Sequence, residues 1–169
     1  VEYARASGGM YLDMTIHDFD MARFLVGEVE EVYAMGSVLV APWLKEADDV
    51  DTDIVTLRFT DGTLGVIDNS RQAVYGYDQR LEVFCSAGIA KADNQSVDTV
   101  VCGDTSGMHG ALPPRFFMQR YPDTYVNEVR SFIDCVAHDT PPQVTGKDGR
   151  LSVVMGYAAE KSRHENRPV

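Results

Sequence analysis

The chain has 169 residues, 44% of them hydrophobic, and a formal net charge of −11 at pH 7. This length and composition suit a single globular domain spanning residues 1–169. The acidic balance argues against a nucleic-acid or anionic-membrane partner, because both are bound by clustered Lys and Arg. No apolar run is long enough to cross a membrane. The cysteines, Cys85, Cys102 and Cys135, are too widely spaced for a disulfide framework, so we expect reduced thiols and a cytoplasmic protein.

Near the N-terminus, apolar residues recur at helical spacing from Leu12 to Val26, and Gly27 follows as a stop signal. Asp13 and His17 are four residues apart, so one turn of this helix would hold both side chains on one side. A carboxylate beside an imidazole can orient it and make it a better proton acceptor. The spacing alone leaves open a second interpretation, in which the acidic residues only complement the helix dipole.

A metal site is another interpretation of the same stretch, since His17, Asp18 and Asp20 carry nitrogen and oxygen ligands. On a helix, however, Asp18 and Asp20 point away from His17, and no second histidine follows at ligand spacing. The remaining histidines are far away in the sequence: His109, His138 and His164. We therefore predict no metal site.

The middle of the chain has the alternation and turn signals of strands. The predicted strands are residues 29–40, 53–59, 64–69, 81–85, 89–92 and 97–102. An Asp-Gly turn joins the second to the third, which is typical of a hairpin. The segment 103–122 is predicted as a long loop. Helices are predicted over 123–138 and from a capping-box pattern at Thr145 to about His164.

This order predicts an α+β fold, with helices on one face of an open, mainly antiparallel sheet of about six strands. The other face of such a sheet must meet water, another domain or another subunit. Its mixed composition favours a partner.

Two further segments carry groups that bind small molecules. Residues 69–80, NSRQAVYGYDQR, are dense in groups that bind hydroxyls, although an exposed strand edge would explain them equally well. Residues 116–122, FFMQRYP, place a tyrosine before a proline in the predicted loop. No nucleotide-binding or nucleophile-elbow motif is present.

Several motifs together resemble the glucose–fructose oxidoreductase and inositol dehydrogenase (Gfo/Idh/MocA) family. They are the pattern GGxxxDxxxHxxDxxxFLxG over residues 8–27, the strand and turn VTLRFTDGT over 55–63, VFCSAG over 83–88, and PxVTGxDG over 142–149. The stretches 12–20 and 69–80 look closest to the inositol dehydrogenase branch. The resemblance covers nearly the whole chain.

The resemblance implies that this chain is the C-terminal domain of a two-domain oxidoreductase. In the family, an N-terminal Rossmann domain binds NAD or NADP and contributes a lysine to the site. The C-terminal domain supplies much of the substrate site and mediates dimers or tetramers. The implied reaction oxidises a secondary hydroxyl of a polyol such as myo-inositol with NAD. The Rossmann domain is absent from this chain, so we expect the chain alone to be inactive.

By motif position, the resemblance implies that His17 is the general base and that Asp13 orients it and binds substrate with the lysine. Tyr75 is implied to contact substrate, with Tyr77 as the other choice of register. Tyr121 is implied to lie near the cofactor. Two other functions stay open: a sheet module that serves only oligomer assembly, and a metal-dependent isomerase or hydrolase built on His17.

Overall fold

The computed structural model describes residues 1–169 and divides them into two compact units. The first unit consists of Val1–Gln72 and Gln143–Val169, and the second is Ala73–Pro142. Both ends of the chain therefore belong to the first unit, and the second unit is inserted between its two segments in the sequence.

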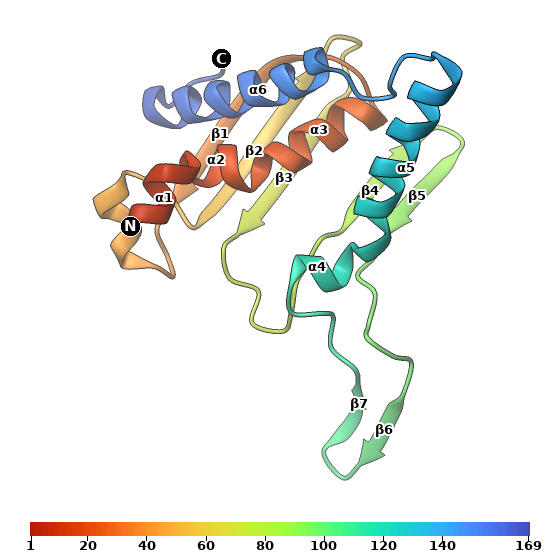
Figure 1. Ribbon diagram of the computed structural model, residues 1–169. Coiled ribbons are helices and arrows are strands. Elements are labelled where there is room, and N and C mark those ends of the chain that lie inside the picture. The colour runs from red at the N-terminus through yellow and green to blue at the C-terminus, as the bar shows by residue number, and fades with distance from the viewer. The chain divides into compact units, whose positions relative to one another are not determined.

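A three-stranded antiparallel sheet forms the first unit's frame. Its strands are β1 (Val29–Ser37), β2 (Thr52–Phe59) and β3 (Leu64–Ser70), in the order β1-β2-β3. The helices of this unit are α1 (Glu2–Ser7), α2 (Gly9–Asp13), α3 (Thr15–Leu25), the 3₁₀ helix η1 (Pro42–Ala47) and α6 (Gly146–Glu165). Figure 1 shows α3 and α6 side by side across one face of this sheet.

The core lies between that sheet face and the helices. Along β2, inward and outward residues alternate, as the period of a strand requires. Val55, Leu57 and Phe59 are buried, whereas Ile54 on the opposite face is 46% exposed. From the helices, Phe19 is fully buried in the same cluster. The alternation predicted from the sequence is thus the pattern that builds the core.

The hairpin between β2 and β3 is confirmed. Gly62 of the Asp-Gly turn has a φ of +88°, a conformation that glycine adopts at little steric cost. The Asp61 carboxylate accepts a hydrogen bond from the Thr63 backbone N–H at 2.9 Å. The predicted start of the last helix is also confirmed, because Thr145 and Asp148 form a reciprocal capping box at the N-terminus of α6.

The N-terminal helix differs from the prediction. The expected continuous helix from Leu12 to Val26 is two helices, α2 and α3, separated at Met14. The Met14 backbone has φ −116° and ψ −64°, and its carbonyl accepts the His17 N–H at 3.2 Å. That bond spans three residues instead of four, so the chain makes one tighter turn between Asp13 and His17.

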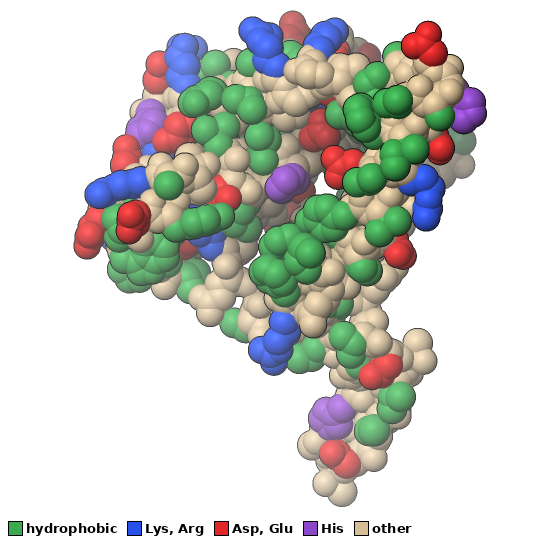
Figure 2. Space-filling model, in the orientation of Figure 1, with side chains coloured by type: hydrophobic (Ala, Val, Ile, Leu, Met, Phe, Trp, Pro, Cys, Tyr) green, Lys and Arg blue, Asp and Glu red, His purple; other side chains and the backbone are tan.

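The second unit contains two hairpins and two helices. The strands are β4 (Leu81–Cys85), β5 (Gly88–Ala92), β6 (Val101–Asp104) and β7 (Gly107–Gly110), and the helices are α4 (Phe117–Arg120) and α5 (Pro122–His138). None of the residues 73–142 is buried. The predicted apolar stripe of α5 is exposed, with Val129 at 59% and Val136 at 68%. Figure 2 shows apolar side chains gathered over α4 and α5.

The α+β class and the antiparallel strands are confirmed, but the pairing of the strands differs from a single six-stranded sheet. Seven strands form one three-stranded sheet and two separate hairpins. The predicted loop over 103–122 contains β7 and α4, and α1 and η1 were not predicted. Short elements of this kind have too few residues to show a period. No helix is both long and apolar enough to span a membrane, and all three cysteines are free thiols.

Candidate functional site

The Asp13 carboxylate, at the end of α2, is held on both oxygens. Its Oδ1 accepts a hydrogen bond from the Tyr3 hydroxyl at 2.9 Å, and its Oδ2 lies 3.4 Å from Nη1 of Arg71. The hydrogen bond to Asp13 raises the pKa of Tyr3, because it stabilises the protonated phenol beside a carboxylate. Asp13 is therefore oriented by α1 and by the end of β3. A carboxylate has about four acceptor positions, so further hydroxyls can still bind it.

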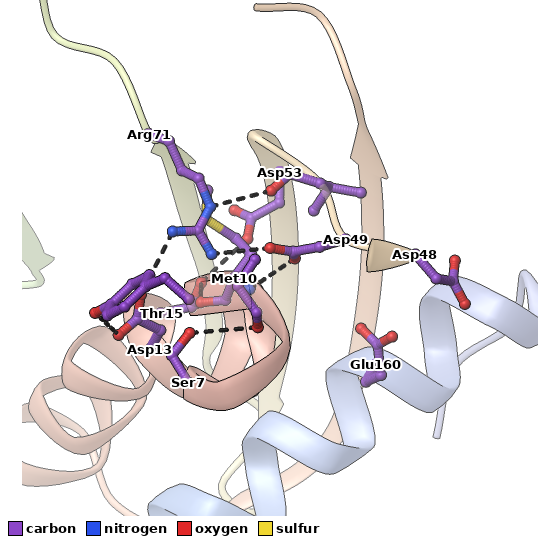
Figure 3. Close-up of polar contacts among 12 residues, drawn as sticks. Ser7, Met10, Asp13, Thr15, Asp48, Asp49, Asp53, Arg71 and Glu160 are labelled. Atoms are coloured by element: carbon purple, nitrogen blue, oxygen red, sulfur yellow. Dashed lines mark hydrogen bonds and ion pairs between the residues drawn. The ribbon is translucent and has the colours of Figure 1, made fainter. Parts of the chain in front are cut away.

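Arg71 links Asp13 to the start of α2 (Figure 3). Its Nη2 lies 2.9 Å from Oδ2 of Asp49, and its Nε donates to the Val50 carbonyl at 3.4 Å. The other oxygen of Asp49 accepts the Met10 backbone N–H at 2.8 Å, which caps α2. One planar guanidinium thus presents separate N–H groups, in a fixed fork, to two carboxylates and a carbonyl at once, a geometry that an ammonium group lacks.

The glycine pair at the start of α2 makes this cap possible. Gly9 has a φ of +77°, and a Cβ built on it would lie 2.8 Å from Oδ1 of Asp49. A side chain at Gly9 would therefore displace the carboxylate that caps Met10 and binds Arg71. The Gly-Gly signature serves the approach of Asp49 as well as the backbone turn.

His17 lies in the first turn of α3 with its side chain exposed. No hydrogen bond or ion pair joins it to Asp13 or to any other side chain of the first unit. The expected pairing of Asp13 with His17 on one helical turn is therefore not formed. The helix is interrupted at Met14, and the Asp13 carboxylate binds Tyr3 and Arg71 instead. Both residues lie in one short segment of the chain, in which the Asp13 carboxylate is anchored and the His17 imidazole has no side-chain partner.

Asp18 and Asp20 hold α3 in place. Oδ2 of Asp18 accepts from the Asn69 side-chain amide on β3 at 2.9 Å, and Oδ1 of Asp20 accepts from the Ser152 hydroxyl on α6 at 3.1 Å. They connect the helix to the sheet and to α6. No group of three His, Cys, Asp or Glu side chains in the structure is placed to hold a metal ion.

The tyrosines implied by the resemblance lie in the second unit. The Tyr75 hydroxyl donates a hydrogen bond to Asp78, whose pKa is lowered to about 2, chiefly by the Arg80 guanidinium. The rings of Tyr77 and Tyr121 meet edge to face with centroids 5.9 Å apart. The structure therefore groups Tyr77, and not Tyr75, with Tyr121.

Sequence reasoning did not identify Tyr3, Asp49 and Arg71, which hold Asp13 and the start of α2. It also did not identify Asp53, whose Oδ2 lies 3.1 Å from the Thr15 hydroxyl at the start of α3. Arg71 lies within the hydroxyl-binding stretch 69–80, but its partners are remote in sequence, with Asp13 58 residues away. Asp53 did leave a signal. It stands in phase with Val55 and Leu57 on the buried side of β2, where a carboxylate is unusual.

Comparison with known proteins agrees with this fold. A family model for the GFO/IDH/MocA C-terminal domain matches residues 1–91. The chain is 55% identical to a myo-inositol 2-dehydrogenase of Thermotoga maritima over 100% of its length and 51% of that protein. It is 31% identical to a scyllo-inositol 2-dehydrogenase (NAD(+)) of Bacillus subtilis, over 99% of the chain and 49% of that protein.

A crystal structure of a putative myo-inositol dehydrogenase from Sinorhizobium meliloti superposes with a TM-score of 0.96 at 40% identity. The match covers 99% of this chain and 51% of that one. The chain thus spans about half the length of the curated relatives it matches. The chain belongs to the GFO/IDH/MocA family, in its C-terminal domain.

Proposed function

We propose that this chain is the substrate-binding half of an NAD-dependent inositol dehydrogenase. The observation that carries the proposal is the segment from Gly9 to His17, where Asp13 is anchored and His17 is free. The identity over the whole chain to a myo-inositol 2-dehydrogenase, and to a relative whose name specifies NAD(+), supports the choice of substrate and cofactor.

In the proposed mechanism, Asp13 accepts a hydrogen bond from a substrate hydroxyl and holds the polyol ring near α3. His17 takes the proton of the hydroxyl that is oxidised, as an exposed imidazole in reach of bound substrate can do. The carbon then loses a hydride and becomes a ketone. When bound, the nicotinamide supplies the hydride acceptor. Tyr75 or Tyr77 is proposed to contact the substrate.

The cofactor's main binding site is proposed to lie in the other half of the protein. Every strand pair in this chain is antiparallel, whereas a dinucleotide pyrophosphate is held at the glycine-rich turn of a parallel βαβ unit. Within this chain, Tyr121 is the residue proposed to approach the cofactor. The chain alone is expected to be inactive, because it lacks that unit.

The test is turnover of the full-length protein that contains this chain, measured as NADH formed from myo-inositol. Replacing His17 with Ala should lower kcat by about 100-fold or more, the usual contribution of a general base. His138→Ala is the matched control, because His138 is an exposed histidine of the second unit, and it should leave turnover unchanged. Unchanged turnover in His17→Ala would remove His17 from the mechanism.

We also propose that the outer face of the β1-β2-β3 sheet joins copies of the protein into a dimer or tetramer. Large apolar side chains on this face are exposed: Met35, Ile54, Leu64 and Val66. An exposed apolar sheet face of this kind is typical of a subunit interface. Assembly as the protein's sole role is the second candidate function.

A further inference from the structure

Asp53 is a buried carboxylic acid that the proposed mechanism does not use. It lies on the core side of β2 and is 2% exposed. Its Oδ1 is buried without a hydrogen-bond partner. An ionised carboxylate in such a place carries a large desolvation cost, so its surroundings decide which form it takes.

The only side chain that holds Asp53 is Thr15, the first residue of α3. Thr15 Oγ1 lies 3.1 Å from Oδ2 of Asp53 and 2.7 Å from Oδ1 of Asn69, with the Met10 carbonyl at 3.4 Å. If Asp53 is ionised, all three neighbours are acceptors, whereas a hydroxyl has one hydrogen to donate.

Asn69 cannot resolve this conflict by turning its amide. Its Nδ2 donates to the Asp18 carboxylate at 2.9 Å, so its Oδ1 must face Thr15. The shortest bond therefore runs from the Thr15 hydroxyl to Asn69. A neutral Asp53 completes the chain, because its own O–H can donate to Thr15 Oγ1. Each hydrogen then has one acceptor, from Asp53 through Thr15 to Asn69, and the Asn69 amide donates to Asp18.

No ion pair joins Asp53 to a cation, and the Arg71 guanidinium at the end of β3 is paired with Asp13 and Asp49. The charged groups that act on its carboxyl are Asp18 on α3 and Asp68 on β3, both negative, while α2 presents the Tyr11 phenol and β1 has Gly36 opposite. Burial raises the pKa of Asp53 to about 7, and the two aspartates add to the rise, whereas hydrogen bonds from the Thr15 hydroxyl and the Asn69 backbone oppose it.

We propose that Asp53 is a positioning residue of the dehydrogenase site, which acts in its neutral form by donating to Thr15 and fixing the start of α3. Thr15 lies between Asp13 and His17, so a shift of this turn moves both. When Asp53 ionises, it competes with Asn69 for the single hydrogen of Thr15, and the tie between α3 and β3 weakens. This inference rests on the proposed function.

The test compares kcat between about pH 6 and pH 9 in the full-length protein and in its Asp53→Asn variant. Asparagine has nearly the same shape, donates to Thr15 and does not titrate. The general base gives both proteins the same pH dependence of its own, so the two are compared as a ratio. The ratio of wild-type to Asp53→Asn kcat should be close to one near pH 6 and should fall several-fold as the pH rises through about 7. Asp68→Asn is the matched control, because it removes a neighbouring exposed charge and should show the same fall relative to Asp53→Asn as the wild type does.

A second measurement separates this inference from the proposed function. The carboxyl carbon of Asp53, assigned by ¹³C NMR through its loss in Asp53→Asn, should titrate near pH 7 whether or not inositol is a substrate. Absence of inositol oxidation with this titration intact would overturn the function and leave the neutral Asp53 in place. Titration near pH 4, or identical pH profiles of kcat in wild type and Asp53→Asn, would overturn the inference.

Discussion

At the scale of single residues, Arg71 is the support on which the candidate site most depends. Its side chain is 17% exposed and pairs with Asp49, which is 8% exposed, as well as with Asp13. Arg71→Met would leave the nearly buried Asp49 charge unpaired. We expect a loss of about 2 kcal/mol in the free energy of unfolding, measured by urea denaturation, together with lower turnover. Arg71→Lys should recover part of the stability but not the turnover, since an ammonium lacks the fixed fork that spans both carboxylates.

The control for Arg71 is Arg58→Met, which removes an exposed ion pair with Glu31. Exposed pairs contribute about 0–1 kcal/mol, so this variant should stay close to the wild type in both measurements. Equal losses in the two variants would mean that Arg71 has no special role.

At the scale of elements, the start of α2 depends on the approach of Asp49 to a residue without a side chain. We expect Gly9→Ala to destabilise the protein by more than the roughly 1 kcal/mol typical of alanine at positive φ, because its Cβ would also displace Asp49. Gly62→Ala separates the two effects: Gly62 has a φ of +88° but open space around its Cβ position. Thermal unfolding of both variants is the measurement. Equal losses of stability would show that the contact with Asp49 is unimportant.

At the scale of the whole molecule, the outer face of the β1-β2-β3 sheet is the proposed contact between subunits. Val66 at its β3 edge is 69% exposed. We expect Val66→Glu to shift the full-length protein toward smaller oligomers in analytical ultracentrifugation, because a buried unpaired charge at an interface is costly. Leu39→Glu introduces the same charge at a residue that is 70% exposed outside the sheet, and it should leave the mass unchanged. A wild type that sediments as a monomer would contradict the proposal.

The elements that were predicted well are those whose causes are local. The bounds of β4, the Asp-Gly hairpin and the capping box at Thr145 follow from residues within a few positions of each other. Alternation along β2 correctly separated the buried from the exposed side chains, because it reflects the geometry of a strand. The family could also be recognised, since its motifs are short and each has a fixed spacing.

The elements that were predicted poorly depend on contacts between distant parts of the chain. The break at Met14 occurs where Thr15 is tied to Asp53 and Asn69, which are 38 and 54 residues away. Helical periodicity continues through Met14, so no local signal marks the break. The apolar stripe of α5 has the pattern of a buried helix face, yet it is exposed within its unit.

The sequence by itself determined the α+β class, the family and the short segment that carries Asp13 and His17, because periodicity, capping and motif spacing are properties of neighbouring residues. Only the tertiary structure decided how that segment is held. Arg71 anchors Asp13, Asp49 caps α2, and the buried Asp53 meets Thr15, leaving His17 free. Such pairings depend on which strands and helices pack together, and burial then sets the charge state of the groups they enclose.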